Sequence, residues 1–236
     1  MFMLGLDRQN RNDLKKIFKP SFKKLSILLM AAGAMVILSV PATWLWGYYE
    51  RWGLREDFDQ ELVSSLSANQ ELIDRLTGEA ELEKIKQLAI AKRAQLSTEQ
   101  TIAILEIPKI GINAVVVEGT EEGSLRKGIG HLEETALPGM QDNFAIAGDR
   151  VLWGGPFLNL DDLAPGDAIR LKTTYADFKY KVTSSVIIVP EDTSVLGGRG
   201  KDEITLITCD PPWSTSNRLV VKGELVEARL LDTIQG

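Results

Sequence analysis

The stretch TLITCDPPWSTSNRLVV, from Thr205 to Val221, holds the single cysteine of the chain, Cys209. Two runs rich in β-branched residues flank a loop with two adjacent prolines. Because proline cannot donate to a strand ladder, the first run should end at this loop. The stretch therefore predicts two neighbouring antiparallel strands that bring Cys209 close to Arg218.

Similar short runs fill the chain from Thr101 onward, and Gly, Pro, Asn and Asp separate them. No long helical period lies among these runs. Many short strands with turn signals are typical of a closed barrel or a sandwich, so we predict a mainly β domain over residues 100–236. The runs are ILEIPKI, INAVVVEG, NFAIAGD, DAIRLKT, FKYKVTSSVIIV, EITLITC and RLVVKGELVEARLL.

Cys209 suits nucleophilic chemistry if its thiol loses its proton. A free thiol has a pKa of about 8.5, and a neighbouring cation lowers this pKa. Arg218 would favour the thiolate and would offer planar donors to a developing oxyanion. A lone cysteine at a strand end also suits the role of a small buried apolar residue, so the residues alone leave both interpretations open.

The composition excludes several other classes of site. The chain has 236 residues, 44% of them hydrophobic, and a net charge of -6, which suits one globular core with an appendage. One cysteine rules out an internal disulfide, and one histidine with one cysteine rules out the usual zinc sites. No basic stripe with interleaved aromatic residues is present, so no nucleic acid is expected as a partner.

Residues 25–46, LSILLMAAGAMVILSVPATWLW, contain no charged side chain and predict a transmembrane helix. About 20 such residues span a bilayer, and the aromatic residues at the end of the segment suit an interfacial belt. A cleaved signal peptide, the alternative, has a shorter apolar region followed by small residues. Residues 1–24 are basic, so we predict a single-pass plasma-membrane protein with this segment in the cytoplasm and everything after Tyr48 outside.

Residues 47–99 are rich in Glu, Lys, Gln, Leu and Ala. Leucine and isoleucine recur there at roughly helical spacing, and Gly78 predicts a break between two helices. The charged residues suit solvated helix faces. We therefore predict a helical stalk that leads from the membrane to the β domain.

The TLITC run with its following arginine, Arg218, resembles the signature of the sortases, the membrane-anchored cysteine transpeptidases of Gram-positive surfaces. The resemblance covers about residues 100–230, and the stretches around 155–157 and 190–196 are most similar to class E. It implies a closed sortase-type β-barrel of about eight strands. The other stretches that resemble the family, in the same order, are LEIPKIGINAVVVEG, GIGHLEETALPGMQDNFAIAGDR and PFLNLDDLAPGDAIRL.

The resemblance also implies a reaction and its partners. Cys209 would attack the Thr carbonyl of a C-terminal sorting signal, LPXTG-like or LAXTG-like, to form a thioacyl enzyme that a cell-wall precursor amine resolves. Arg218 would steady the oxyanion or the peptide backbone. The implied partners are surface proteins bearing the signal, this amine, and the lipid bilayer through residues 25–46. No cofactor or metal is required. Some sortases bind calcium through acidic loops, and the candidates here are Glu118, Glu121 and Glu122.

The same resemblance implies residues that contact the peptide. Thr208 and Ile207 would line the floor of the groove. Ala147 and Gly148 would leave room for the peptide, with simple strand packing as the alternative. His131, the single histidine, aligns with a family position upstream of the catalytic base. It is a candidate for the pocket wall, or a hydrogen-bonded structural residue.

The chain departs from the family pattern at the base. Sortases have Ala-Gly-His-Arg there, whereas this chain has Ala-Gly-Asp-Arg, with Asp149 in place of the histidine. An aspartate anion has no proton for the leaving amine, and it raises the pKa of a neighbouring thiol. A general acid contributes about 10²–10⁴-fold in rate, so we expect catalysis by Cys209, Asp149 and Arg218 to be strongly impaired.

Several alternatives remain open. Asp149 could be protonated in an apolar pocket and act as the acid, although Arg150 and Arg218 would favour its charged form. His131 could instead turn into the site. Three other functions fit the motifs less fully: a binding module for sorting signals without turnover, an L,D-transpeptidase, and an anchored barrel with an inert buried cysteine. L,D-transpeptidases place His-Gly before the cysteine, where this chain has isoleucine and threonine.

Overall fold

The computed structural model describes residues 22–76, 80–198 and 200–231. The side chains of residues 22–25, 36–48, 50, 67, 71, 74 and 75 also lie outside the description. The chain divides into two compact units, residues 1–46 and 47–236. The β domain and the candidate site belong to the second unit.

Two longer helices precede the strands, α2 (Phe22–Arg75) and α3 (Glu81–Arg93). They confirm the helical prediction for the described part of residues 47–99, and the predicted break at Gly78 lies outside the described residues. Apolar side chains of both helices are buried against strands. Phe58 packs with Ile104, Val115 and Val117, and α3 adds Ile85, Leu88 and Ala89 to the main core.

The predicted stalk did not include this packing of the helices on the barrel. Phe58 and Ile85 are almost completely buried in the second unit. Burying such side chains stabilises a fold by roughly 1.5–3 kcal/mol each. The described residues of the second unit therefore include the helices as part of one folded body with the strands.

No helix among the described residues is both long enough and apolar enough to cross a bilayer. Most of the predicted transmembrane segment, residues 25–46, has side chains that lie outside the description.

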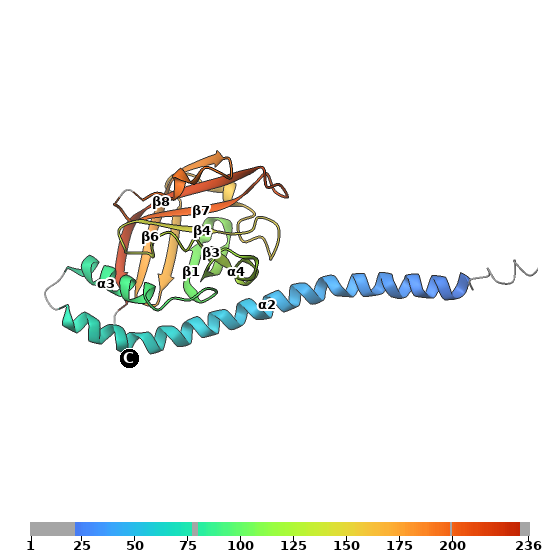
Figure 1. Ribbon diagram of the computed structural model, residues 1–236, viewed down its shortest axis with the longest axis horizontal. Helices are drawn as coiled ribbons and strands as arrows, with labels where there is room; N and C mark the ends of the chain where they lie inside the picture. Colours follow the sequence, from blue (N-terminus) through green and yellow to red (C-terminus); the bar gives the residue numbers. More distant parts are fainter. Residues whose placement is uncertain (1–21, 77–79, 199, 232–236) are drawn as a thin grey trace, which may run out of the picture. The chain divides into compact units, whose positions relative to one another are not determined.

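The strands close into one barrel, in the order β1-β2-β3-β4-β7-β8-β6-β5, which confirms the predicted closed β-barrel (Figure 1). Most neighbours are antiparallel, but β2 pairs with β3, and β4 with β7, in parallel. The strands are β1 (Thr101–Ile107), β2 (Ile112–Glu118), β3 (Ile129–His131), β4 (Asn143–Ala147), β5 (Ala168–Thr173), β6 (Ala176–Ile188), β7 (Glu203–Asp210) and β8 (Asn217–Leu230).

Local chemistry explains where strands begin and end. On β5 and the first part of β6, buried and exposed residues alternate, as expected for strands with one face on the core. The predicted run 104–110 extends too far, because Pro108 lacks an N–H and starts the short 3-10 helix η1 (Pro108–Ile110). Gly111, with a φ of 69°, then turns the chain into β2.

Strand β3 and the short elements between strands carry no clear signal in the sequence and were not predicted. These are α4 (Glu122–Lys127) and two further 3-10 helices, η2 (Leu160–Asp162) and η3 (Thr193–Leu196). Each is too brief to set up a recognisable period in the sequence.

Candidate active site

The pair of strands β7 and β8 places Cys209 directly opposite Arg218 in the antiparallel register. Residues opposite each other on such a pair point to the same face. Cys209 is a free cysteine and the residue is partly exposed. The predicted pairing of the two strands is confirmed, and it sets the thiol and the guanidinium on one face at one end of the barrel.

The guanidinium of Arg218 is held by its own loop. Its Nη1 donates to the carbonyl of Thr215 at 3.1 Å and to that of Asn217 at 3.0 Å. In the part of the chain that is described, no hydrogen bond joins this guanidinium to the thiol. A guanidinium carries five N–H donors, so Arg218 has further donors beyond these two bonds.

The parallel pair β4 and β7 brings Asp149 to the same place. Ala147 pairs with Ile207, the N–H of Gly148 donates to the carbonyl of Ile207 at 3.1 Å, and the Thr208 hydroxyl donates to the carbonyl of Gly148 at 2.8 Å. Asp149 and Cys209 each lie two residues beyond the Ala147–Ile207 pair. Because the pair is parallel, both residues follow it at the same end of the two strands.

Burial raises the pKa of the Asp149 carboxyl above its ordinary value. The cause of this shift is loss of water around the carboxyl, which disfavours its charged form. From the sequence, Arg150 and Arg218 were expected to favour the charged carboxylate, and the shift has the opposite direction. The protonated form of Asp149 therefore persists to a higher pH than it does in a free aspartate.

The guanidinium of Arg150 binds groups other than the Asp149 carboxyl. Its side chain is only 3% exposed, and its Nη2 and Nη1 pair with Asp161 and Asp210, each at 2.7 Å. Nη1 also donates to the carbonyl of Cys209, and Nε donates to that of Leu158, both at 3.3 Å. Arg150 thus connects the end of β7 to two segments that follow β4. The sequence analysis missed this role, since nothing in the sequence pairs these residues.

The groove residues expected from the sequence divide into two kinds. Ile207 and Ala147 are partly exposed, whereas Thr208 and Gly148 are buried. The Thr208 hydroxyl donates to the carbonyl of Gly148, which follows β4. A Cβ on Gly148 would lie 2.6 Å from the Phe157 ring. Strand packing therefore accounts for Gly148 and Thr208, and only Ile207 and Ala147 offer surface to a peptide.

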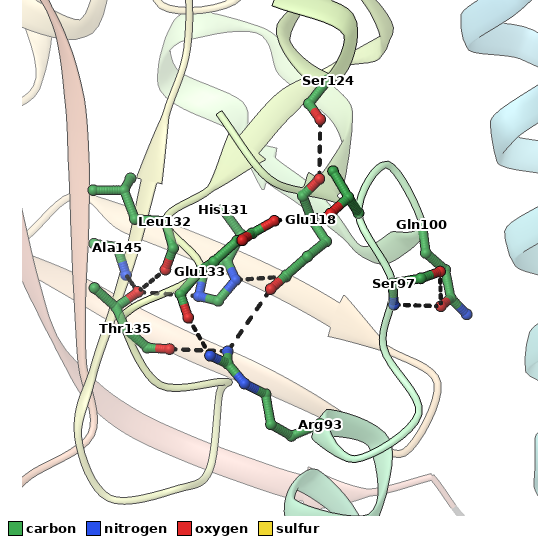
Figure 2. A network of polar contacts seen from close by, with 11 residues as sticks. Arg93, Ser97, Gln100, Glu118, Ser124, His131, Leu132, Glu133, Thr135 and Ala145 are labelled. Carbon is green, nitrogen blue, oxygen red and sulfur yellow. Dashed lines mark hydrogen bonds and ion pairs between the residues drawn. The ribbon is translucent and has the colours of Figure 1, made fainter. Parts of the chain in front are cut away.

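His131 lies on β3 with no exposed surface. Its Nδ1 is 2.7 Å from a carboxylate oxygen of Glu118, and its Nε2 is 3.0 Å from the hydroxyl of Thr135 (Figure 2). Its ring stacks on Phe144, with the ring centroids 4.9 Å apart. Both ring nitrogens have partners, so the geometry favours the structural alternative for His131 over a contact with peptide or with the thiol.

Polar contacts around His131 join α3 to the barrel. Arg93 of α3 donates to the carbonyls of Thr135 and Glu133, and it lies 3.9 Å from Glu118 (Figure 2). The Thr135 hydroxyl also accepts the N–H of Ala145 in β4 at 3.1 Å. This buried network fixes β4 from the side opposite β7, and so supports the strand that leads to Asp149.

Replacing Thr135 with valine tests this network. The change keeps the shape of the side chain but leaves the Ala145 N–H and one nitrogen of His131 without a partner, which costs about 1–3 kcal/mol. We expect the free energy of unfolding to fall by that amount in chemical denaturation. The matched control is Thr120→Val at an exposed position, which should change it by less than about 0.5 kcal/mol. Equal values for the two variants would contradict a stabilising role for the hydroxyl.

Two of the acidic residues considered for calcium bind other side chains. Glu118 binds His131, and Glu122 pairs with Arg126 at 2.9 Å. Among the residues that the structure describes, no group of three metal-ligating side chains lies close enough to hold an ion.

Known proteins resemble this chain over the barrel. A family model described as Sortase domain matches residues 105–226. Sortase D of Bacillus subtilis is 35% identical over 133 residues, which are 55% of this chain and 66% of that protein. Sortase SrtE1 of Streptomyces coelicolor is 35% identical over 159 residues, which cover 60% of this chain and 45% of that protein. The chain thus spans less than two thirds of the length of these curated relatives.

A solved structure gives the same fold. The crystal structure of sortase E1 from Streptomyces coelicolor with tripeptide in the active site is 32% identical, with a TM-score of 0.54. The match covers 57% of this chain and 93% of that chain. Because class D and class E relatives have the same 35% identity, these similarities do not separate the classes.

Proposed function

Because this chain belongs to the sortase family, we propose that it acts outside the cell on surface proteins with a C-terminal sorting signal, as a cysteine transpeptidase of reduced turnover. The adjacency of β4, β7 and β8 supports this proposal. Cys209 on β7 pairs with Arg218 on β8, and Asp149 follows β4 at the same end of the barrel. A nucleophile, a proton carrier and a cation at one place are the groups that acyl transfer needs.

The proposed reaction has two steps. The Cys209 thiolate attacks the Thr carbonyl of an LPXTG-like or LAXTG-like peptide, and N–H groups of Arg218 stabilise the oxyanion that forms. The C–N bond to the following residue then breaks, and the leaving amine takes a proton. An amine of a cell-wall precursor attacks the thioester next, forms a new amide and releases the Cys209 thiol.

The proton for the leaving amine is the weak point of this chain. Asp149 can supply it only while protonated, and the raised pKa of its carboxyl supports that role over a wider pH range than usual. Above this pKa the carboxylate has no proton to give and disfavours the thiolate of Cys209. Attack needs the Cys209 thiolate, and departure of the amine needs protonated Asp149, so only the small fraction of molecules that carries both forms is active. We therefore infer turnover that is slow at neutral pH and that falls further below the pKa of Asp149.

A second candidate function is a binding module that holds the sorting signal without cleaving it. Two observations favour it: a carboxyl stands where an imidazole is expected, and Arg218 is bound to the carbonyls of its own loop. Ile207 and Ala147 would still offer surface to the peptide.

Trapping of the thioester separates these two functions. We expect the full chain, incubated with a sorting-signal peptide, to gain the mass of the acyl fragment on Cys209. Cys209→Ala should bind the peptide but gain no mass. Binding by the parent without any adduct would establish the binding module and refute acyl transfer. Absence of both would leave the barrel without either function.

We also propose that residues 25–46 anchor the chain in the plasma membrane, with residues 1–24 in the cytoplasm. The absence of charge in this segment and the basic residues before it support this orientation. Membership of class E is likewise a proposal, supported by the similarity to the Streptomyces coelicolor proteins.

A further inference from the structure

A cleft of about 340 Å³ lies between the first helix of the second unit and the barrel. Its wall combines two arginines with aromatic and aliphatic side chains, and it contains no carboxylate. The lining residues that matter here are Arg51, Trp52, Arg55, Val115, Trp153 and Pro156. The acyl-transfer site proposed above does not use this cleft.

The two arginines of the cleft each use one guanidinium nitrogen in a hydrogen bond to a described residue. Nη1 of Arg51 donates to the carbonyl of Trp153 at 2.9 Å, and Nη2 of Arg55 donates to the side-chain oxygen of Asn113. Neither arginine has a carboxylate partner among the residues described. A guanidinium carries five N–H donors, and the described residues account for one donor of each arginine, so further donors can serve a ligand of the cleft.

The loop formed by residues 153–155 lies at the cleft, with its backbone close to Arg51. Trp153, Gly154 and Gly155 all have positive φ angles, and a Cβ on Gly154 would lie 3.6 Å from the guanidinium of Arg51. Arg126 lies over the Trp153 ring, 4.8 Å from its centroid. The loop therefore presents backbone to one cation of the cleft and places its aromatic side chain beside another cation.

We propose that this cleft binds the phosphodiester headgroup of an anionic membrane lipid. Free guanidinium donors match phosphate oxygens, and the apolar part of the wall suits a ligand that also has hydrocarbon. Trp52 is 61% exposed beside the arginines, as interfacial tryptophans are. Arg51 also follows the predicted transmembrane segment closely in the sequence. This inference rests on the membrane anchor proposed above, but it does not require catalysis.

A binding experiment on the full chain in detergent micelles tests the site. The Cys209→Ala background removes acyl transfer, so failure of the catalytic proposal does not affect the result. The probe is dihexanoylphosphatidylglycerol, titrated by calorimetry. We expect saturable binding that weakens by at least about ten-fold in Arg51→Gln/Arg55→Gln. The matched control is Arg170→Gln/Lys181→Gln, which removes two exposed charges from β5 and β6 and should bind as the parent does.

Three further arms make the result decisive. Arg51→Lys/Arg55→Lys keeps both charges and should bind more tightly than the glutamine variant. Dihexanoylphosphatidylcholine and inorganic phosphate should each bind at least about ten-fold more weakly than the anionic lipid. Unchanged affinity in the glutamine variant, equal affinity of the lysine and glutamine variants, or equal binding of either comparison ligand would overturn the proposal.

Discussion

Replacing Asp149 with histidine should raise the rate of sorting-peptide cleavage by about 10²–10⁴-fold at neutral pH. An imidazolium can donate a proton to the leaving amine, and its charge favours the Cys209 thiolate where a carboxylate opposes it. The side chain at this position follows β4 next to the end of β7, so the new group would lie beside the sulfur. Steady-state cleavage of a fluorogenic sorting peptide measures the effect.

Asp149→Asn is the matched control for the histidine variant. Asparagine removes the negative charge but carries no ionisable proton, so it should remain far slower than histidine. If asparagine and histidine gave the same rate, the benefit would come from loss of the anion and not from acid catalysis. A parent that cleaves as fast as the histidine variant would refute our interpretation of Asp149.

The pH profile of the parent gives an independent test of Asp149. Because burial raises the pKa of this acid, its protonated form is fully present well below that pKa and is lost as the pH rises through it. Turnover also needs the Cys209 thiolate, whose fraction rises with pH, so the two changes offset each other above the pKa of Asp149 and activity falls below it. Because imidazole titrates at a higher pH than a carboxyl, parent activity should persist to a lower pH than that of Asp149→His. Acidic limbs that coincide for the two proteins would exclude Asp149 as the proton donor.

Much of the barrel could be predicted from the sequence because strand signals are local. Runs of residues with β preference, bounded by turn residues, indicated all the longer strands. The proline loop after Cys209 indicated that β7 and β8 pair, with Cys209 opposite Arg218. β3 was missed because three residues carry no periodicity. The packing of α2 and α3 was also missed, since an apolar stripe alone does not say which surface will cover it.

The chemical environment of the site was harder to predict than its residues. Proximity in sequence suggested that Arg150 would act on Asp149, but its guanidinium turns to Asp161 and Asp210 instead. His131 could be listed as structural or functional from the sequence alone. Only the fold brings Glu118 and Thr135 to its two nitrogens. In both cases partners distant in sequence decide what an ionisable side chain does.

Replacing Arg150 with glutamine should lower the free energy of unfolding by about 3 kcal/mol. Removing one member of a buried ion pair typically costs about 3–5 kcal/mol, because the partner charge is left unpaired. Asp161 is 57% exposed and tolerates this loss, so we expect the lower part of that range, with Asp210 at 20% exposure as the main cause. Chemical denaturation monitored by tryptophan fluorescence measures the change.

A second measurement tells whether Arg150 also sets the properties of the thiol. Without the guanidinium, the neighbouring Asp210 carboxylate loses its cation partner and should disfavour the thiolate, so alkylation of Cys209 by iodoacetamide should be slower at a given pH. Asp161→Asn is the control, because it removes the exposed partner and leaves the pair with Asp210 intact. It should cost less than about 1 kcal/mol and leave the alkylation profile unchanged. A glutamine variant that is destabilised but alkylates with the parent profile would restrict Arg150 to a structural role. A shifted profile would place it among the residues that position and tune the nucleophile.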